Sequence, residues 1–116
     1  MTSRDVLRLL FACILLLMLA VTLWASSSQS VWQWQGLIRQ PDRAWTIATL
    51  CDAYAGFLTF YVWVYYKERA KGRVLWFVAI MLFGNIAMAI FMLRELARLK
   101  ANEPLEQLLM RRLDDR

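Results

Sequence analysis

The chain lacks histidine altogether, and its 116 residues include only two cysteines, two prolines and four glycines. Histidine is the commonest protein ligand for haem, zinc, copper and chlorophyll magnesium, so its absence leads us to expect no metal and no cofactor. Cys13 and Cys51 stand early in two successive apolar segments, which places them in opposite halves of a membrane. Because that separation is too large for a disulfide, both are expected to pack as small side chains.

The prolines also stand outside the apolar segments, so no proline kink is expected within them. Hydrophobic residues make up 60% of the composition, more apolar surface than a chain this short can bury in a soluble core. Three apolar segments, about residues 9–25, 45–66 and 74–93, approach the length of about 20 residues that crosses a bilayer. We predict an all-α membrane protein with three continuous transmembrane helices over these segments.

The remaining segments indicate the domain organisation. We expect residues 1–100 to form one transmembrane domain whose first loop, 26–44, lies at the membrane surface, and residues 101–116 to form a tail. Leucines recur at helical spacing over about 104–113, which predicts a short amphipathic helix on lipid headgroups or on a partner protein. Tryptophan is common at membrane–water interfaces. The expected interface anchors are Trp24, Trp32, Trp34 and Trp45.

The connection between the second and third segments is short and basic, which predicts an antiparallel helix pair. It carries Lys67, Arg69, Lys71 and Arg73 against the single acid Glu68. Together with Arg4 and Arg8, these residues favour a cytoplasmic N-terminus, because basic residues near helix ends are retained on that side. Three crossings would then place the C-terminus outside, and we expect the location to be a bacterial inner membrane.

One acid, Asp52, interrupts the second apolar segment. A carboxyl group at bilayer depth is costly, so a chain that keeps one usually has a partner or a task for it. At 1.5 Å per residue, Asp52 lies about 10 Å from one surface, at nearly the depth of Asn85 in the third segment. Thr22 of the first segment lies shallower on that side and has a hydroxyl to donate. We therefore predict an intramembrane polar cluster of Asp52, Asn85 and Thr22.

Three roles for this cluster stay open. Asp52 is either a protonated residue that fixes helix register through Asn85, a proton or cation relay, or a contact for a ligand. Small residues at helical spacing favour close approach of a neighbouring helix. The residues predicted for such packing are Ala48, Gly56, Thr59, Gly84 and Ala89.

Three stretches carry a resemblance to a known family, namely LLLMLAVTLWAS, ATLCDAYAGFLTFYVWVYYKE and LWFVAIMLFGNIAMAIFML. They resemble an uncharacterised family of small three-helix membrane proteins of bacteria and plants, classified as a domain of unknown function. The likeness covers about residues 7–93 and leaves the tail outside. It implies an architecture and no activity. Its recognisable segments include, without assigned roles, Asp52, Tyr54, Gly56, Gly84 and Asn85.

No group of residues specifies a reaction. General acid–base catalysis needs a second titratable group near Asp52, and none is expected at its depth, so we expect no enzymatic activity. The sequence predicts a non-catalytic accessory, assembly or structural subunit that packs against a larger respiratory, photosynthetic or transport complex. Its partners would be the lipid bilayer and either other membrane subunits or further copies of the chain, and not nucleic acid.

The alternative is an oligomeric small transporter or channel in which Asp52 relays protons or cations. Transporters often use broken helices, whereas each crossing predicted here is continuous.

Overall fold

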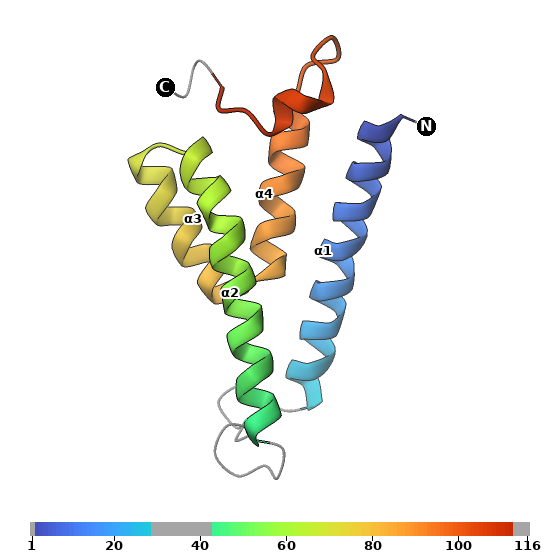
Figure 1. Cartoon of the computed structure of the whole chain (residues 1–116). Helices are drawn as coiled ribbons and strands as arrows, with labels where there is room; N and C mark the ends of the chain where they lie inside the picture. Colours follow the sequence, from blue (N-terminus) through green and yellow to red (C-terminus); the bar gives the residue numbers. More distant parts are fainter. Residues whose placement is uncertain (1, 29–42, 113–116) are drawn as a thin grey trace.

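The computed structural model describes residues 2–28 and 43–112. The described chain is helical and holds no strand, which confirms the all-α prediction. Figure 1 shows the helices running alternately down and up, with the described beginning and end of the chain at one end of the molecule. The helices are α1 (Ser3–Ser28), α2 (Arg43–Lys67), α3 (Ala70–Phe83) and α4 (Asn85–Arg98), followed by a short 3-10 helix, η2 (Leu105–Leu108).

Two of the helices, α1 and α2, are long and apolar enough to cross a membrane. The predicted segments 9–25 and 45–66 lie inside them, and each helix extends further at both ends. None of the residues of α1 is buried within the protein. Both helices therefore present their apolar side chains outward along most of their length.

The prediction of a third continuous crossing over residues 74–93 is wrong. The chain ends α3 at Phe83, reverses at Gly84 and begins α4 at Asn85. Each of these helices has 14 residues. At 1.5 Å per residue each is about 21 Å long, short of the roughly 30 Å hydrocarbon thickness. They form a helical hairpin whose two open ends lie on the same side of the molecule (Figure 1).

Gly84 makes this reversal possible. Its φ of 54° and ψ of −122° lie in a region that side chains other than glycine rarely adopt. Its N–H donates to the Ile80 carbonyl at 2.8 Å and so closes the last turn of α3. A Cβ at this position would lie 2.7 Å from Cζ of Phe57, which packs against the turn from α2. Both the backbone angle and the close packing therefore require glycine.

The hairpin packs between the two long helices, with α4 along α1 and α3 along α2. Phe91 of α4 is fully buried at the centre of an aromatic cluster. Its ring makes edge contacts with Phe60 and Trp63 of α2 and with Trp76 of α3, at centroid distances of 6.0, 5.4 and 5.1 Å. The core thus lies where α2, α3 and α4 meet, toward the end that holds the hairpin's open side.

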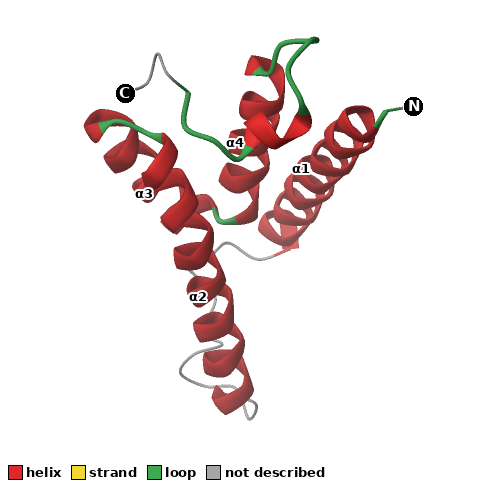
Figure 2. Cartoon of the chain, turned by 45° about the horizontal axis from the view of Figure 1, so that its top comes forward, coloured by secondary structure: helices red, strands yellow, loops and turns green. Residues whose placement is uncertain are grey.

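The tail differs from the predicted amphipathic helix over 104–113. Of the described tail residues, only the single turn of η2 is helical, and it docks on the protein's own helices, with Leu108 buried against Met92 and Leu96. Arg4 of α1 donates to the carbonyls of Lys100 and Glu103. The tail therefore lies beside the N-terminal end of α1 (Figure 2). The prediction that the N-terminus and the tail lie on opposite sides of the membrane was wrong, because both are at one end of the molecule.

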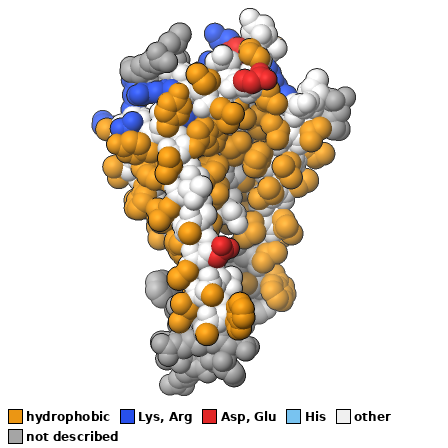
Figure 3. Space-filling view, viewed as in Figure 1, with side chains coloured by type: hydrophobic (Ala, Val, Ile, Leu, Met, Phe, Trp, Pro, Cys, Tyr) orange, Lys and Arg blue, Asp and Glu red, His pale blue; other side chains and the backbone are white. Residues whose placement is uncertain are grey.

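Charged side chains gather at this same end. Figure 3 shows Lys and Arg there and hydrophobic side chains over most of the remaining visible face. We call the part formed by residues 2–8, 66–73 and 94–112 the charged end. It contains eleven of the chain's 14 basic residues, namely Arg4, Arg8, Lys67, Arg69, Lys71, Arg73, Arg94, Arg98, Lys100, Arg111 and Arg112.

The two central glycines give a matched test of the hairpin turn. Gly84→Ala is expected to destabilise the protein by about 1 to 3 kcal/mol, because alanine is strained at this backbone angle and its Cβ meets the Phe57 ring. Gly56→Ala is the control, since a Cβ there meets nothing within 4 Å. It should be neutral or stabilise by up to about 1 kcal/mol. Unfolding in detergent measures both, and equal stability of the two variants would contradict this account.

Candidate functional site

A buried ion pair connects α2 to α4 at the charged end. The Lys67 ammonium lies 2.7 Å from the Glu95 carboxylate, and their side chains are only 3% and 1% exposed. A buried charge is tolerated only when it is paired and hydrogen-bonded. Lys67 meets this condition, because it also donates to the Leu108 carbonyl and lies 5.1 Å from the centre of the Trp63 ring. The pair therefore joins α2, α4 and the tail at one point.

Further charges surround the pair. Arg98 lies 3.3 Å from the second carboxylate oxygen of Glu95, and Arg94 pairs with Glu68 at the end of α2. Both oxygens of Glu95 are thus occupied by cations, and Lys67 is enclosed by protein groups. A catalytic acid or base needs access to a substrate proton. The arrangement holds the helices together and offers no open position for chemistry.

Hydrogen bonds connect the tail to α1 and α2, and Leu108 packs on α4. Besides Arg4, which bonds the tail to α1, the Trp63 indole of α2 donates to the Leu109 carbonyl at 3.1 Å. Within the tail, Glu103 accepts from the Lys100 backbone N–H at 2.9 Å and faces Arg112 at 3.6 Å. This N–H bond and the nearby positive charge lower the pKa of Glu103, so the carboxylate stays ionised at neutral pH.

A half-open pocket of about 360 Å³, which we call the interior cavity, lies between α1, α2 and α4 and is bordered by Leu109 of the tail. Its lining is almost wholly apolar, and Asn85 is the one amide that reaches it. No titratable group lines it, and no cluster of three or more metal-binding side chains occurs in residues 2–28 and 43–112. The cavity suits an apolar group. It is lined by Phe11, Ile14, Phe60, Trp63, Asn85, Met88, Ala89, Met92 and Leu109.

The predicted polar cluster is not joined by hydrogen bonds in the structure. Asp52, Thr22 and Asn85 are all exposed, and none of the described side chains bonds one of them to another. Asn85 begins α4 directly after Gly84, which packs at the level of Phe57. Asp52 lies five residues earlier on α2, about 7.5 Å away along the helix axis. Asn85 therefore faces the interior cavity, while Asp52 lies beyond the hairpin turn.

The face of α2 that carries Asp52 points away from the other described helices. We call Ala48, Asp52, Gly56 and Thr59 the Asp52 face; all four are exposed, and Gly56 borders open space. The bulky side chains opposite make the contacts within the protein. For example, the Tyr54 hydroxyl donates to the Met81 carbonyl at 3.1 Å, and Phe57 covers Gly84. The described residues thus leave the Asp52 face uncovered, so that another molecule can reach it there.

The structure divides the remaining predicted residues into several groups. Gly84 and Ala89 are buried, whereas Trp24 and Trp45 are 70% and 77% exposed. Trp32 and Trp34 lie outside the described residues. The four basic residues between α2 and α3 lie in different surroundings. Lys67 is buried, and Arg73 donates to the Tyr65 carbonyl and lies over the Tyr65 ring. Arg69 is the N-cap residue of α3, and Lys71 is exposed.

Sequence reasoning missed Glu95 as a site residue, although the pattern contains a signal for it. Glu95 follows Phe91 by four residues and Met92 by three, so on a helix it lies on their apolar face. An acid on such a face needs a cation. A continuous third crossing, however, would place Glu95 across the membrane from Lys67, so the predicted topology keeps the two side chains apart.

The ion pair predicts non-additive mutations. Lys67→Met and Glu95→Leu should each destabilise the protein by about 3 to 5 kcal/mol, because each leaves one buried charge unpaired. The double variant should lose clearly less than the sum of the two, since no unpaired charge remains. Arg8→Gln, at an exposed pair with Asp5, is the control and should change little. Denaturant unfolding in detergent measures the cycle, and additive losses would show that the two groups do not interact.

Comparison with known proteins identifies a family. No match was found among curated proteins, and none among solved structures. A family model described as protein of unknown function (DUF1475) matches residues 1–115. The match includes the tail, which the resemblance seen in the sequence left outside. Because it spans nearly the whole chain, the protein belongs to the DUF1475 family.

Proposed function

We propose that the protein is a non-catalytic integral membrane subunit that docks on another membrane protein through its Asp52 face. The membrane setting is supported by the outward position of apolar side chains on both long helices. Leu23 of α1 and Val62 of α2, for example, are each 70% exposed. Water would make this exposure costly, whereas lipid would not. In a bilayer α1 and α2 cross, and the hairpin of α3 and α4 enters and leaves through one leaflet.

The observation that carries the docking proposal is the position of Asp52. Its carboxyl group lies midway along an apolar helix, is exposed, and has no hydrogen-bonding partner among the described residues. In lipid an unpartnered carboxyl is costly, so a donor from a second chain would stabilise it. Gly56 lies one turn away in open space and would let a neighbouring helix approach closely. The unpartnered Asp52 carboxyl and the open space beside Gly56 thus lie on the same face of α2.

The distribution of charge supports an orientation. Eleven basic residues lie at the charged end, whereas at the opposite end the described residues include only Arg43, at the start of α2. Basic residues near helix ends are retained on the cytoplasmic side. We therefore place the charged end, with both the N-terminal residues and the tail, in the cytoplasm of a bacterium.

This topology is tested by cysteine labelling with a membrane-impermeant maleimide in a Cys13→Ser, Cys51→Ser background. Thr2→Cys and Ala101→Cys should react only after the membrane is opened, because both lie at the charged end. Ser27→Cys, at the far end of α1, should react in intact cells. Three full crossings would instead make Thr2→Cys and Ala101→Cys react from opposite sides.

The docking proposal is tested by the size of the particle that mild detergent extracts from native membrane. The wild-type protein should migrate in a larger complex. Gly56→Leu should release it as a single chain, because leucine fills the space that the partner helix needs. Two variants are the controls and should leave the complex intact. Gly56→Ala adds only a methyl group at the same position, and Ala20→Leu adds a large side chain on the exposed surface of α1.

Variants of Asp52 refine the same measurement. Asp52→Asn should keep the complex, because the amide retains a donor and an acceptor. Asp52→Leu should weaken it by about 1 to 2 kcal/mol, or roughly five- to thirtyfold in the dissociation constant. The docking proposal is wrong if the wild-type protein always migrates as a single chain.

A second function, an oligomeric transporter or channel with Asp52 as relay, gains support from one observation. Broken helices are common at transporter binding sites, and the chain breaks at Gly84 beside the interior cavity. The expected continuity of the helices therefore no longer argues against it. Under this function Asp52→Asn would abolish proton or cation flux into liposomes while leaving assembly intact.

A further inference from the structure

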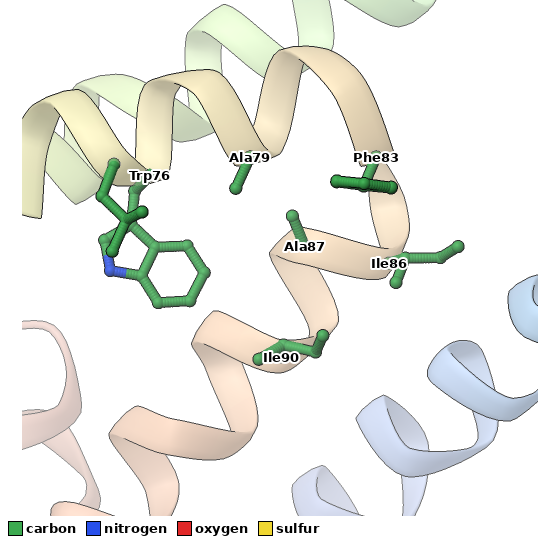
Figure 4. A pocket seen from close by; sticks show the side chains of 7 residues that line it. Trp76, Ala79, Phe83, Ile86, Ala87 and Ile90 are labelled. Carbon is green, nitrogen blue, oxygen red and sulfur yellow. The ribbon is translucent and has the colours of Figure 1, made fainter.

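A groove runs along the hairpin between α3 and α4, separate from the interior cavity. It has a volume of about 270 Å³, and its lining is apolar. Figure 4 shows Ala79 and Ala87 pointing toward each other across it, with Trp76 at one end and Phe83 and Ile86 at the other. Because Phe83 and Ile86 flank Gly84, the deep end of this hairpin groove is closed by the turn. Whatever occupies it enters from the charged end or from the side.

The open end of the hairpin groove carries two cations, one from each helix. Lys71 precedes Leu75 by one turn of α3, and Arg94 follows Ile90 by one turn of α4, so each lies on the same side of its helix as a groove residue. The Arg94 guanidinium also lies 5.8 Å from the centre of the Trp76 ring. A positive mouth therefore continues directly into an apolar channel.

The balance of charge at this mouth is positive. Glu68 pairs with Arg94 and neutralises part of it, but the exposed Lys71 has no acidic partner among the described residues. The first turn of α3 contains no acid. Because Glu68 offsets Arg94, the partial positive charge of the helix N-terminus adds to the one net positive charge that Lys71 supplies. These features together favour an anion at the mouth.

The depth of the groove selects the class of ligand. A helix of 14 residues is about 21 Å long, which spans one leaflet and the adjoining headgroup region. An acyl chain also reaches from the headgroups to the middle of the bilayer. A spanning helix of another protein would extend beyond the closed end of the groove. The positive mouth and the one-leaflet depth of the hairpin groove thus fit one lipid of the leaflet that the hairpin enters.

We propose that the hairpin groove binds one anionic phospholipid, with an acyl chain along Ala79 and Ala87 and its phosphate held by Lys71 and Arg94. The site rests on the proposed membrane location and is independent of the Asp52 face. It assigns to the hairpin a lipid-binding role that is distinct from docking. Lipid bound here also fills the space that the two alanines leave between α3 and α4.

The test uses the full-length protein purified in mild detergent and supplied with phosphatidylglycerol or phosphatidylcholine of identical acyl chains. Native mass spectrometry should find one phosphatidylglycerol retained in preference to phosphatidylcholine. Lys71→Glu should weaken retention of phosphatidylglycerol by about tenfold, because basic residues near the surface attract anionic lipid. Arg8→Glu is the control, since it makes the same change in net charge on α1 and should leave retention unchanged.

A second pair of variants tests the apolar part. Ala79→Phe should abolish retention of the lipid, because the ring fills the channel, whereas Ala20→Phe on the exposed surface of α1 should not. In the wild type, phosphatidylglycerol should also raise the midpoint of thermal unfolding, and in Lys71→Glu this rise should be lost. That readout keeps the test informative if Ala79→Phe does not fold.

Several results would overturn the proposal. These are equal retention of the two lipids by the wild type, unchanged retention in Lys71→Glu, or a dimer that Ala79→Phe dissociates, since the groove would then hold a second copy of the chain. Extraction of membranes at alkaline pH separates this failure from failure of the membrane location. A protein that stays in the membrane but retains no lipid refutes only the lipid site, whereas release of the wild type refutes both.

Discussion

The reversal of the chain at Gly84 determines where the other interactions can form. It returns α4 to the end at which α2 finishes, and so brings Glu95 to Lys67. The tail then emerges beside α1, within reach of Arg4. A straight helix of the same residues would place Glu95 about 33 Å and the end of α4 about 42 Å from their present positions, which is twice the distance of each from the turn at about 1.5 Å per residue. The buried ion pair, the docked tail and the hairpin groove all depend on this one backbone conformation.

The protein separates charge from apolar surface more completely than its composition suggests. The buried pair lies beside the aromatic cluster around Phe91, where the low dielectric strengthens the attraction between Lys67 and Glu95. The exposed basic residues lie further out at the same end. Below them α1 and α2 are apolar, with Asp52 as the one acid in the described part of α2. Its isolation from this otherwise consistent pattern is the reason to assign it a role outside the chain.

Much of the architecture could be predicted from the sequence because hydropathy and length determine it. Such patterns predict the presence and approximate position of α1 and α2. They also predict the antiparallel connection at Lys67 to Ala70 and the exposed tryptophans Trp24 and Trp45. The break at Gly84 could not be found in this way, because residues on both sides of it are apolar and glycine occurs often inside membrane helices. A tertiary contact determines the break, because the Phe57 ring packs where a Cβ of residue 84 would lie. The prediction of a helical tail was wrong for a similar reason, because the spacing of its leucines did not indicate that Leu108 would be buried against Met92 and Leu96.

The hairpin has one more consequence, which concerns the shape of the protein in a bilayer. Of the described helices, α1 and α2 extend past the hairpin turn, whereas α3 and α4 lie only on the charged side of it (Figure 1). If α1 and α2 cross the bilayer as proposed, the described residues supply four helices in one leaflet and two in the other. A wedge of this kind takes up more area on its broad side and would favour membranes curved toward the narrow side, unless a partner fills the narrow leaflet. The unfilled area lies beside the part of α2 that carries Asp52.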